Sequence, residues 1–176
     1  MWHNNAWYYF NKAGERVIGW VTDSNTKYYL GADGVMQVGW VLDNNKWYFF
    51  DTIYGGMKTG WITNNNIRYY LGPNGDMQAG WVSIDGKKYY FDPIYGGMQT
   101  GWIKVGDTKY YLNETGEMRT GWLLQNDKWY YFDTVGAMKT GWYKVDGDDF
   151  YFYSDGIMAA NTVVDGRKID IYGRAK

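Results

Sequence analysis

Short apolar runs, rich in Trp, Tyr, Phe and Val, alternate with short polar segments along the whole chain. The polar segment inside each pair of runs contains Asn, Asp or Gly, as in Asn44-Asn45 and Asp85-Gly86. Asn and Asp tolerate positive φ and Gly has no Cβ, so these segments are typical of tight hairpin turns. The pattern therefore predicts an all-β chain of two-stranded hairpins.

This pattern recurs with a fixed period, which is the first feature to establish in a repeat protein. Successive Gly-Trp pairs are 20 or 21 residues apart, with tryptophans at Trp20, Trp40, Trp61, Trp81, Trp102, Trp122 and Trp142. Methionines keep the same spacing, at Met36, Met57, Met77, Met98, Met118, Met138 and Met158. Between them lies a four-residue aromatic block such as Trp47-Tyr48-Phe49-Phe50, whose positions we number first to fourth. Each repeat is predicted to be a strand, a turn, the block as second strand, and a loop ending in Met.

We expect the 176 residues to form a single repeat module. About seven Gly-Trp-phased units run from 19 to 160, preceded by a partial unit at 1–18. Residues 161–176 lack the Trp and Met and are expected to form a degenerate hairpin that caps the array. A two-stranded hairpin is only marginally stable alone, so stacking of the hairpins into a solenoid is expected.

Composition limits both the core and the possible ligands. Aromatic residues make up 21% of the chain, so the core is expected to be built from rings. The net charge is −1 with no basic cluster, which argues against nucleic acid as a partner. No apolar run reaches about 18 residues, so no membrane span is expected. The first six residues lack the features of a secretory signal, and an export signal is expected on another part of a longer chain.

Candidate catalytic and metal-binding residues are few. His3 is the single histidine and there is no cysteine, which disfavours Ser-His-Asp or Cys-His catalysis. Asp51, Asp92 and Asp133 recur at one phase of the repeat, which is better explained by turn chemistry than by a glycosidase carboxylate pair. Residues 146–149 lack the ligand spacing of an EF-hand. The sequence predicts a chain that is not an enzyme and has no cofactor or metal.

The unit Gly-Trp…Trp-Tyr-Tyr-Phe…Gly-x-Met-x-Thr-Gly-Trp resembles the choline-binding repeat of Gram-positive surface proteins and phage lysins. The best matches are Gly39 to Trp61 and Gly121 to Trp142, and the resemblance extends from about Trp2 to about Met158. It implies a left-handed superhelix of β-hairpins that holds ligand between consecutive hairpins. It also implies a cage made of the Gly-Trp tryptophan, the first position of the block, the Met of the loop and the third position of the next block.

Carried over residue by residue, the resemblance gives two complete cages and a partial one. The complete cages are Trp40, Trp47, Met57 and Tyr70, and Trp122, Trp129, Met138 and Tyr151; the partial one is Trp7 with Tyr29 and Trp2, with Arg16 in the place of Met. A quaternary ammonium cannot donate a hydrogen bond, so a box of π-faces with a thioether wall suits it. The other blocks begin with a charged residue, at Lys27, Arg68, Lys88, Lys109 and Asp149, and those interfaces are expected to be silent or to bind another ligand.

Three functions follow as alternatives. The leading one is a non-catalytic module at the cell surface that binds choline or phosphocholine on teichoic acid, where several weak cages on one polymer would add avidity. The second is binding of a carbohydrate, either a glucan or a host glycan, because rings also stack on sugars. The third is a structural or interaction spacer whose interfaces are packed shut. The resemblance also leaves a homodimer through the C-terminal hairpins as an open expectation.

Overall fold

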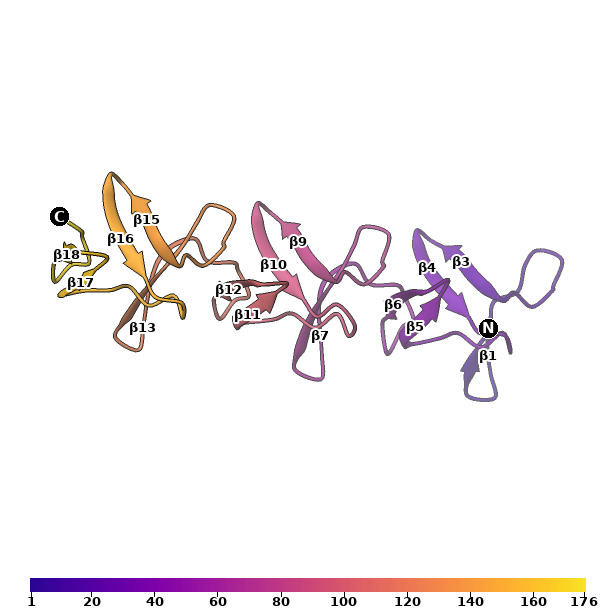
Figure 1. Ribbon diagram of the computed structural model, residues 1–176. Coiled ribbons are helices and arrows are strands. Elements are labelled where there is room, and N and C mark those ends of the chain that lie inside the picture. Colours follow the sequence, from indigo (N-terminus) through magenta and orange to yellow (C-terminus); the bar gives the residue numbers. More distant parts are fainter. The chain divides into compact units, whose positions relative to one another are not determined.

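The computed structural model describes residues 1–176 and contains eighteen strands and no helix (Figure 1). Each strand pairs only with its neighbour in sequence, which gives nine separate two-stranded antiparallel sheets. The predicted all-β fold of tandem two-stranded hairpins is therefore confirmed. No helix is present that could cross a membrane.

The strands of the first half are β1 (Trp2–His3), β2 (Ala6–Trp7), β3 (Gly19–Asp23), β4 (Thr26–Leu30), β5 (Gly39–Asp43), β6 (Lys46–Phe50), β7 (Gly60–Asn64), β8 (Ile67–Leu71), β9 (Gly80–Ile84) and β10 (Lys87–Phe91). Those of the second half are β11 (Gly101–Val105), β12 (Thr108–Leu112), β13 (Gly121–Gln125), β14 (Lys128–Phe132), β15 (Gly141–Val145), β16 (Asp148–Phe152), β17 (Thr162–Val164) and β18 (Arg167–Ile169). Every Gly-Trp pair opens the first strand of a hairpin, and every aromatic block forms the second.

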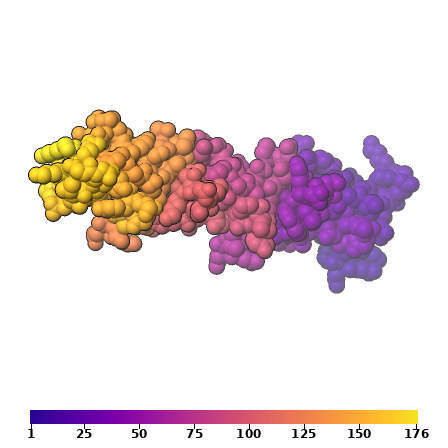
Figure 2. Space-filling model, viewed as in Figure 1, coloured from indigo at the N-terminus to yellow at the C-terminus, as the bar shows by residue number.

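The hairpins belong to two compact units. The first contains Met1–Val82 with Phe91–Met98, and the second contains Ser83–Tyr90 with Gln99–Lys176. The residues of β9 and β10 are divided between the two. In the second unit, residues 161–176 form the last hairpin, β17–β18, which lies against hairpin β15–β16 (yellow on orange in Figure 2) through the 2.8 Å ion pair of Arg167 and Asp149.

The turns have the backbone that their sequences predict. Asn44 and Asn45, the two central residues of one turn, have positive φ of 47° and 60°. The first central residues of two other turns, Asn126 and Asn65, have φ of 51° and 50°. Positive φ at both central residues characterises the two-residue turn whose twist matches that of the flanking strands. The turn also fixes the strand register, which in hairpin β5–β6 places Trp40 opposite Phe49.

The core consists of the fourth block positions covered by tryptophans of the preceding hairpin. Side chains at this position are the largest fully buried ones in the chain: Phe50, Phe91, Phe132, Phe152, Leu71 and Leu112. In the first unit the ring centroids of Trp20 and Phe50 are 5.6 Å apart. In the second unit Trp102 and Phe132 are also 5.6 Å apart. These separations are typical of packed aromatic pairs, so each hairpin contributes one half of a ring core and its neighbour the other.

The methionine loops join consecutive hairpins through the backbone. Met57 forms a β-bridge with Phe50 of its own hairpin. Its N–H donates to the carbonyl of Lys27, the first block position of the preceding hairpin, at 2.8 Å. Every hairpin except the last is hydrogen-bonded in this way to the segment that follows the next hairpin, which satisfies backbone groups that an isolated hairpin would expose.

A glycine of each following loop packs on these methionines, and this contact can be tested. Gly96 has φ +69°, and a Cβ there would overlap Sδ of Met77, whereas Gly80 has φ +68° and open space around it. We predict that Gly80→Ala loses roughly 1–2 kcal/mol of unfolding free energy from backbone strain alone. Gly96→Ala should lose about 1–3 kcal/mol more because Met77 must move. Urea denaturation measures both; equal losses would show that the Met contact does not matter.

Candidate functional site

Hairpin β5–β6 places two tryptophans at a right angle. Trp40 lies opposite Phe49, and Trp47 is two residues before Phe49 on the same strand, so all three side chains point to one face. The rings of Trp40 and Trp47 are 6.5 Å apart with an interplanar angle of 90°. Trp47 keeps 40% of its surface exposed. The corner between the two rings is therefore open to a ligand.

The next hairpin and its loop complete this corner. The ring of Tyr69, the second position of the next block, lies 4.9 Å from Trp40 at 67°. Met77 adds its thioether, because its N–H donates to the carbonyl of Trp47 at 2.8 Å. The resulting pocket, which we call the Trp47 pocket, has a volume of about 400 Å³ and is lined by Trp40, Trp47, Tyr69, Met77, Ile94 and Tyr95. It contains no charged side chain, so attraction for a cation would come from the ring faces.

The structure does not bring Tyr70 to the Trp47 pocket, and that part of the predicted cage is corrected. Tyr70, the third block position, lies opposite Trp61 in its own hairpin, with centroids 5.2 Å apart, and packs on Phe91 at 6.5 Å. Side chains alternate along a strand, so a shift of one residue moves the ring to the other face. The second block position contacts the Gly-Trp tryptophan of the preceding hairpin. Tyr69 therefore lies where the predicted cage has Tyr70.

Met57 is also displaced from the predicted cage, by one whole loop. Its N–H donates to the carbonyl of Lys27 in hairpin β3–β4, its side chain lies against Gly75, and it does not line the Trp47 pocket. Met77, from the loop after β8, takes the expected role. The methionine of each loop hydrogen-bonds to the first block position of the hairpin before its own. It therefore lies in the interface between those two hairpins.

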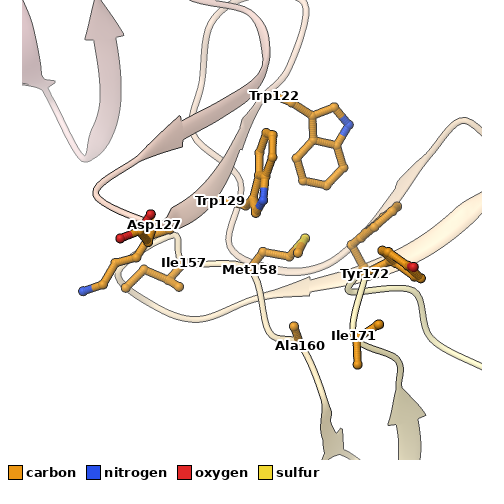
Figure 3. A pocket seen from close by; sticks show the side chains of 10 residues that line it. Trp122, Asp127, Trp129, Ile157, Met158, Ala160, Ile171 and Tyr172 are labelled. Carbon is orange, nitrogen blue, oxygen red and sulfur yellow. The ribbon is translucent and has the colours of Figure 1, made fainter.

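A second pocket with the same construction lies in the second unit (Figure 3). Trp122 and Trp129 are 6.0 Å apart at 89°, and Phe150 lies 4.9 Å from Trp122. The N–H of Met158 donates to the carbonyl of Trp129 at 2.8 Å. This Trp129 pocket has a volume of about 650 Å³ and is lined by Trp122, Asp127, Lys128, Trp129, Phe150, Ile157, Met158, Ala160, Ile171 and Tyr172.

The other two residues predicted for this cage lie elsewhere. Met138 donates its N–H to Lys109, in the interface before the Trp129 pocket. Tyr151 faces Trp142 of its own hairpin at 5.2 Å. The difference from the predicted cage is the same as in the first unit. The ring comes from one residue earlier in the strand, and the methionine comes from one loop later in the chain.

The partial cage near the N-terminus follows the same rule. Its pocket of about 390 Å³ is lined by Met1, Trp7, Tyr8, Tyr9, Val21, Asp23, Tyr28, Leu30, Met36, Ile53 and Tyr54. We call it the Trp7 pocket. The ring centroids of Trp2 and Trp7 are 5.5 Å apart, but Trp2 does not line the pocket. The predicted Tyr29 instead packs on Trp20 at 5.3 Å and donates its hydroxyl to Asp43. A further hydrogen bond from the Trp20 indole is the main cause of the lowered pKa of Asp43.

At two of the remaining interfaces, an arginine of the chain itself occupies the face of the Gly-Trp tryptophan. The guanidinium carbon of Arg68, at the first block position, lies 4.3 Å from the ring centroid of Trp61. That of Arg167 lies 4.4 Å from the centroid of Trp142 and is paired with Asp149. The cation–π contact that a ligand would make is already formed there. This agrees with the expectation that such interfaces do not take choline, which remains a prediction.

The three pockets are suited to recognition of a cation that has an apolar surface. No group of three or more His, Cys, Asp or Glu side chains is arranged to hold a metal ion. The loop carboxylates serve the backbone: Asp51 accepts the N–H groups of Ile53 and Tyr54 at 3.0 and 2.8 Å. Together with the larger contribution of a hydrogen bond from Lys58, these bonds lower the pKa of Asp51 to about 2.

Family models match most of the chain. A model described as choline-binding repeat matches residues 17–59, 58–100 and 99–140. The chain belongs to the choline-binding repeat family. A second model, described as a cell wall binding repeat, matches residues 2–15 and 140–158.

Solved structures of Streptococcus pneumoniae proteins share this fold. CbpJ is 38% identical with a TM-score of 0.95, over 96% of this chain and 61% of that protein. Choline binding protein F is also 38% identical, with a TM-score of 0.90, over 96% and 60%. The choline-binding domain of CbpL is 29% identical with a TM-score of 0.74, over 100% and 95%. The choline-binding repeats described here thus span about three fifths of the first two proteins. No curated protein matches the sequence.

The displaced methionine role gives a direct test. We predict that Met77→Ala weakens choline binding at the Trp47 pocket by about 0.3–1.5 kcal/mol, the range for a sulfur–aromatic contact. Met57→Ala should leave that pocket unchanged. The two methionines are matched, since each packs under a loop glycine, Gly96 or Gly75. Calorimetric titration of both variants decides between them; a larger effect of Met57→Ala would restore the cage predicted from sequence.

Proposed function

We propose that the chain is a binding module that anchors a protein to choline-decorated teichoic acid of a bacterial envelope. The observation that carries this proposal is the coincidence of three features at each of three interfaces. Where the first block position is Trp7, Trp47 or Trp129, a pocket is present, and the carbonyl of that tryptophan fixes the methionine that lines it. Quaternary ammonium is the ligand chemistry that aromatic ring faces with a thioether favour.

Repetition supports anchoring rather than high affinity at one site. Each exposed ring contributes about 0.5–1 kcal/mol to a cation, so a single pocket is expected to be weak. A polymer carrying many choline groups can occupy several pockets at once, and the second contact is then intramolecular. The proposed location is the cell surface. A homodimer through the C-terminal hairpins remains a proposal that the molecular mass in solution would test.

Removal of the first-position tryptophans tests the proposal. We predict that choline changes the intrinsic fluorescence with millimolar saturation, and that Trp47→Ala and Trp129→Ala each weaken one site about 2- to 30-fold, as expected for loss of about 0.5–2 kcal/mol. Lys109→Ala is the control, because it changes a first block position that lacks the tryptophan. A folded protein with a flat choline titration and retention on dextran would instead favour the carbohydrate alternative.

Addition of a tryptophan tests the same rule in the other direction. At the Lys27 interface three members of a pocket are already present: Trp20 and Tyr48 lie 4.8 Å apart, and Met57 is bound to the Lys27 carbonyl. We predict that Lys27→Trp adds one choline site per chain, because the new ring supplies the missing wall. Binding stoichiometry by equilibrium dialysis measures it, with Lys27→Ala as the matched variant that should add none. An unchanged stoichiometry in a folded Lys27→Trp protein would mean that the first position does not decide occupancy.

A further inference from the structure

Each of the three pockets is lined by an Ile-Tyr pair from a loop further along the chain. The pairs are Ile53-Tyr54 at the Trp7 pocket, Ile94-Tyr95 at the Trp47 pocket and Ile171-Tyr172 at the Trp129 pocket. These side chains are among the most exposed large apolar groups in the chain, at 65–76% of their surface. Each exposed pair beside a pocket is available for contact with a ligand.

The loops hold these pairs in place. Asp92 accepts the N–H groups of Ile94 and Tyr95 at 2.9 and 2.7 Å, which shapes the backbone before the pair. The next residue, Gly96, packs on Met77, the methionine of the same pocket. In the second unit Tyr172 donates its N–H to Asp170 at 2.9 Å, and Gly173 packs on Met158. The backbone on both sides of the pair is thus fixed relative to the pocket.

Other loops have a glycine at the same place, and at Gly75, Gly136 and Gly156 it also packs on a methionine, but the residues before it differ. The residues that precede the glycine in these loops are mostly polar: Asp33, Asn74, Thr115, Val135 and Asp155. Loop length does not account for the difference, since Asp170 to Gly173 spans the same number of residues as Asp133 to Gly136. The Ile-Tyr pair accompanies a tryptophan at the first block position of the pocket that it lines. The pair is therefore a recurring part of the three tryptophan pockets.

The position of the pair indicates what it contacts. In Figure 3 Met158 lies between the two tryptophans on one side and Ile171 and Tyr172 on the other. The pocket volumes, about 390 to 650 Å³, are in the range that holds ligands larger than a bare tetraalkylammonium ion. With the ammonium group against the first-position tryptophan, the group attached to the nitrogen would extend toward the pair. Ile can cover its methylene carbons, and the Tyr hydroxyl can donate to a phosphate oxygen.

We propose that Ile53-Tyr54, Ile94-Tyr95 and Ile171-Tyr172 are specificity-determining residues that bind the phosphoethyl substituent of a quaternary ammonium ligand. This inference rests on the proposed function, because it needs the ammonium group to lie against the first-position tryptophan. It distinguishes phosphocholine from small ammonium ions that carry no such substituent.

The experiment isolates one pocket in the full-length chain. Trp7→Lys and Trp129→Lys introduce at two pockets the residue that the chain itself carries at Lys27, Lys88 and Lys109, which leaves the Trp47 pocket. In this background Tyr95→Ala is titrated with phosphocholine, choline and tetramethylammonium by fluorescence, and circular dichroism checks the fold. The matched control is Tyr172→Ala, the same change in a pocket already disabled. Tyr95→Phe separates the hydroxyl from the ring.

We expect Tyr95→Ala to weaken phosphocholine binding about 3- to 10-fold, as for loss of one hydrogen bond and a ring contact, and tetramethylammonium binding less than about 2-fold. Tyr95→Phe should weaken phosphocholine only, and Tyr172→Ala should change nothing. Equal losses for all three ligands, or none, would overturn the inference while leaving choline binding intact. A folded background that binds none of the ligands would contradict the proposed function and the inference with it.

Discussion

The structure depends on the contact between the Gly-Trp indole of one hairpin and the aromatic block of the next. A two-stranded hairpin buries too little to be stable alone. Phe50, which has no exposed surface, is covered by Trp20 of the preceding hairpin, and Met57 then pairs with the backbone of that same hairpin. Each hairpin is stabilised by its neighbours, as in other repeat proteins, and no hairpin forms a complete core by itself.

The pockets arise from the same contact. A Gly-Trp tryptophan lies beside a second-position ring of the next hairpin at several interfaces, including Trp20 with Tyr48 and Trp102 with Tyr130, so most of an aromatic box is present there. The first block position decides what completes the box. At Trp47 it is a second indole at a right angle, whereas at Arg68 the chain's own guanidinium covers the tryptophan face. We therefore propose that one substitution at this position changes the binding capacity without changing the fold, in line with the separation of function from fold.

The fold could be predicted from sequence because its determinants are local and periodic: Asn44-Asn45 fixes a turn, and Gly-Trp and Met fix the phase. The first-position tryptophans were also identified correctly as neighbours of Trp40 and Trp122. Tyr69 and Met77 were missed because the face of the next hairpin depends on stacking between repeats, which sequence spacing does not specify. Strand alternation could have signalled Tyr69, since Tyr70 lies opposite Trp61 in any two-residue hairpin. The Ile-Tyr pairs lie two hairpins from the tryptophans that they approach, and only the structure connects them.

A crystal structure of the chain with choline would show whether the first block position controls binding. We expect trimethylammonium density at three interfaces, bounded by Trp7 with Tyr28, Trp47 with Tyr69, and Trp129 with Phe150. We expect none over Trp61, whose face carries Arg68. Density distributed over all interfaces regardless of the first block position, or no density at the three tryptophan pockets, would show that this position does not control binding.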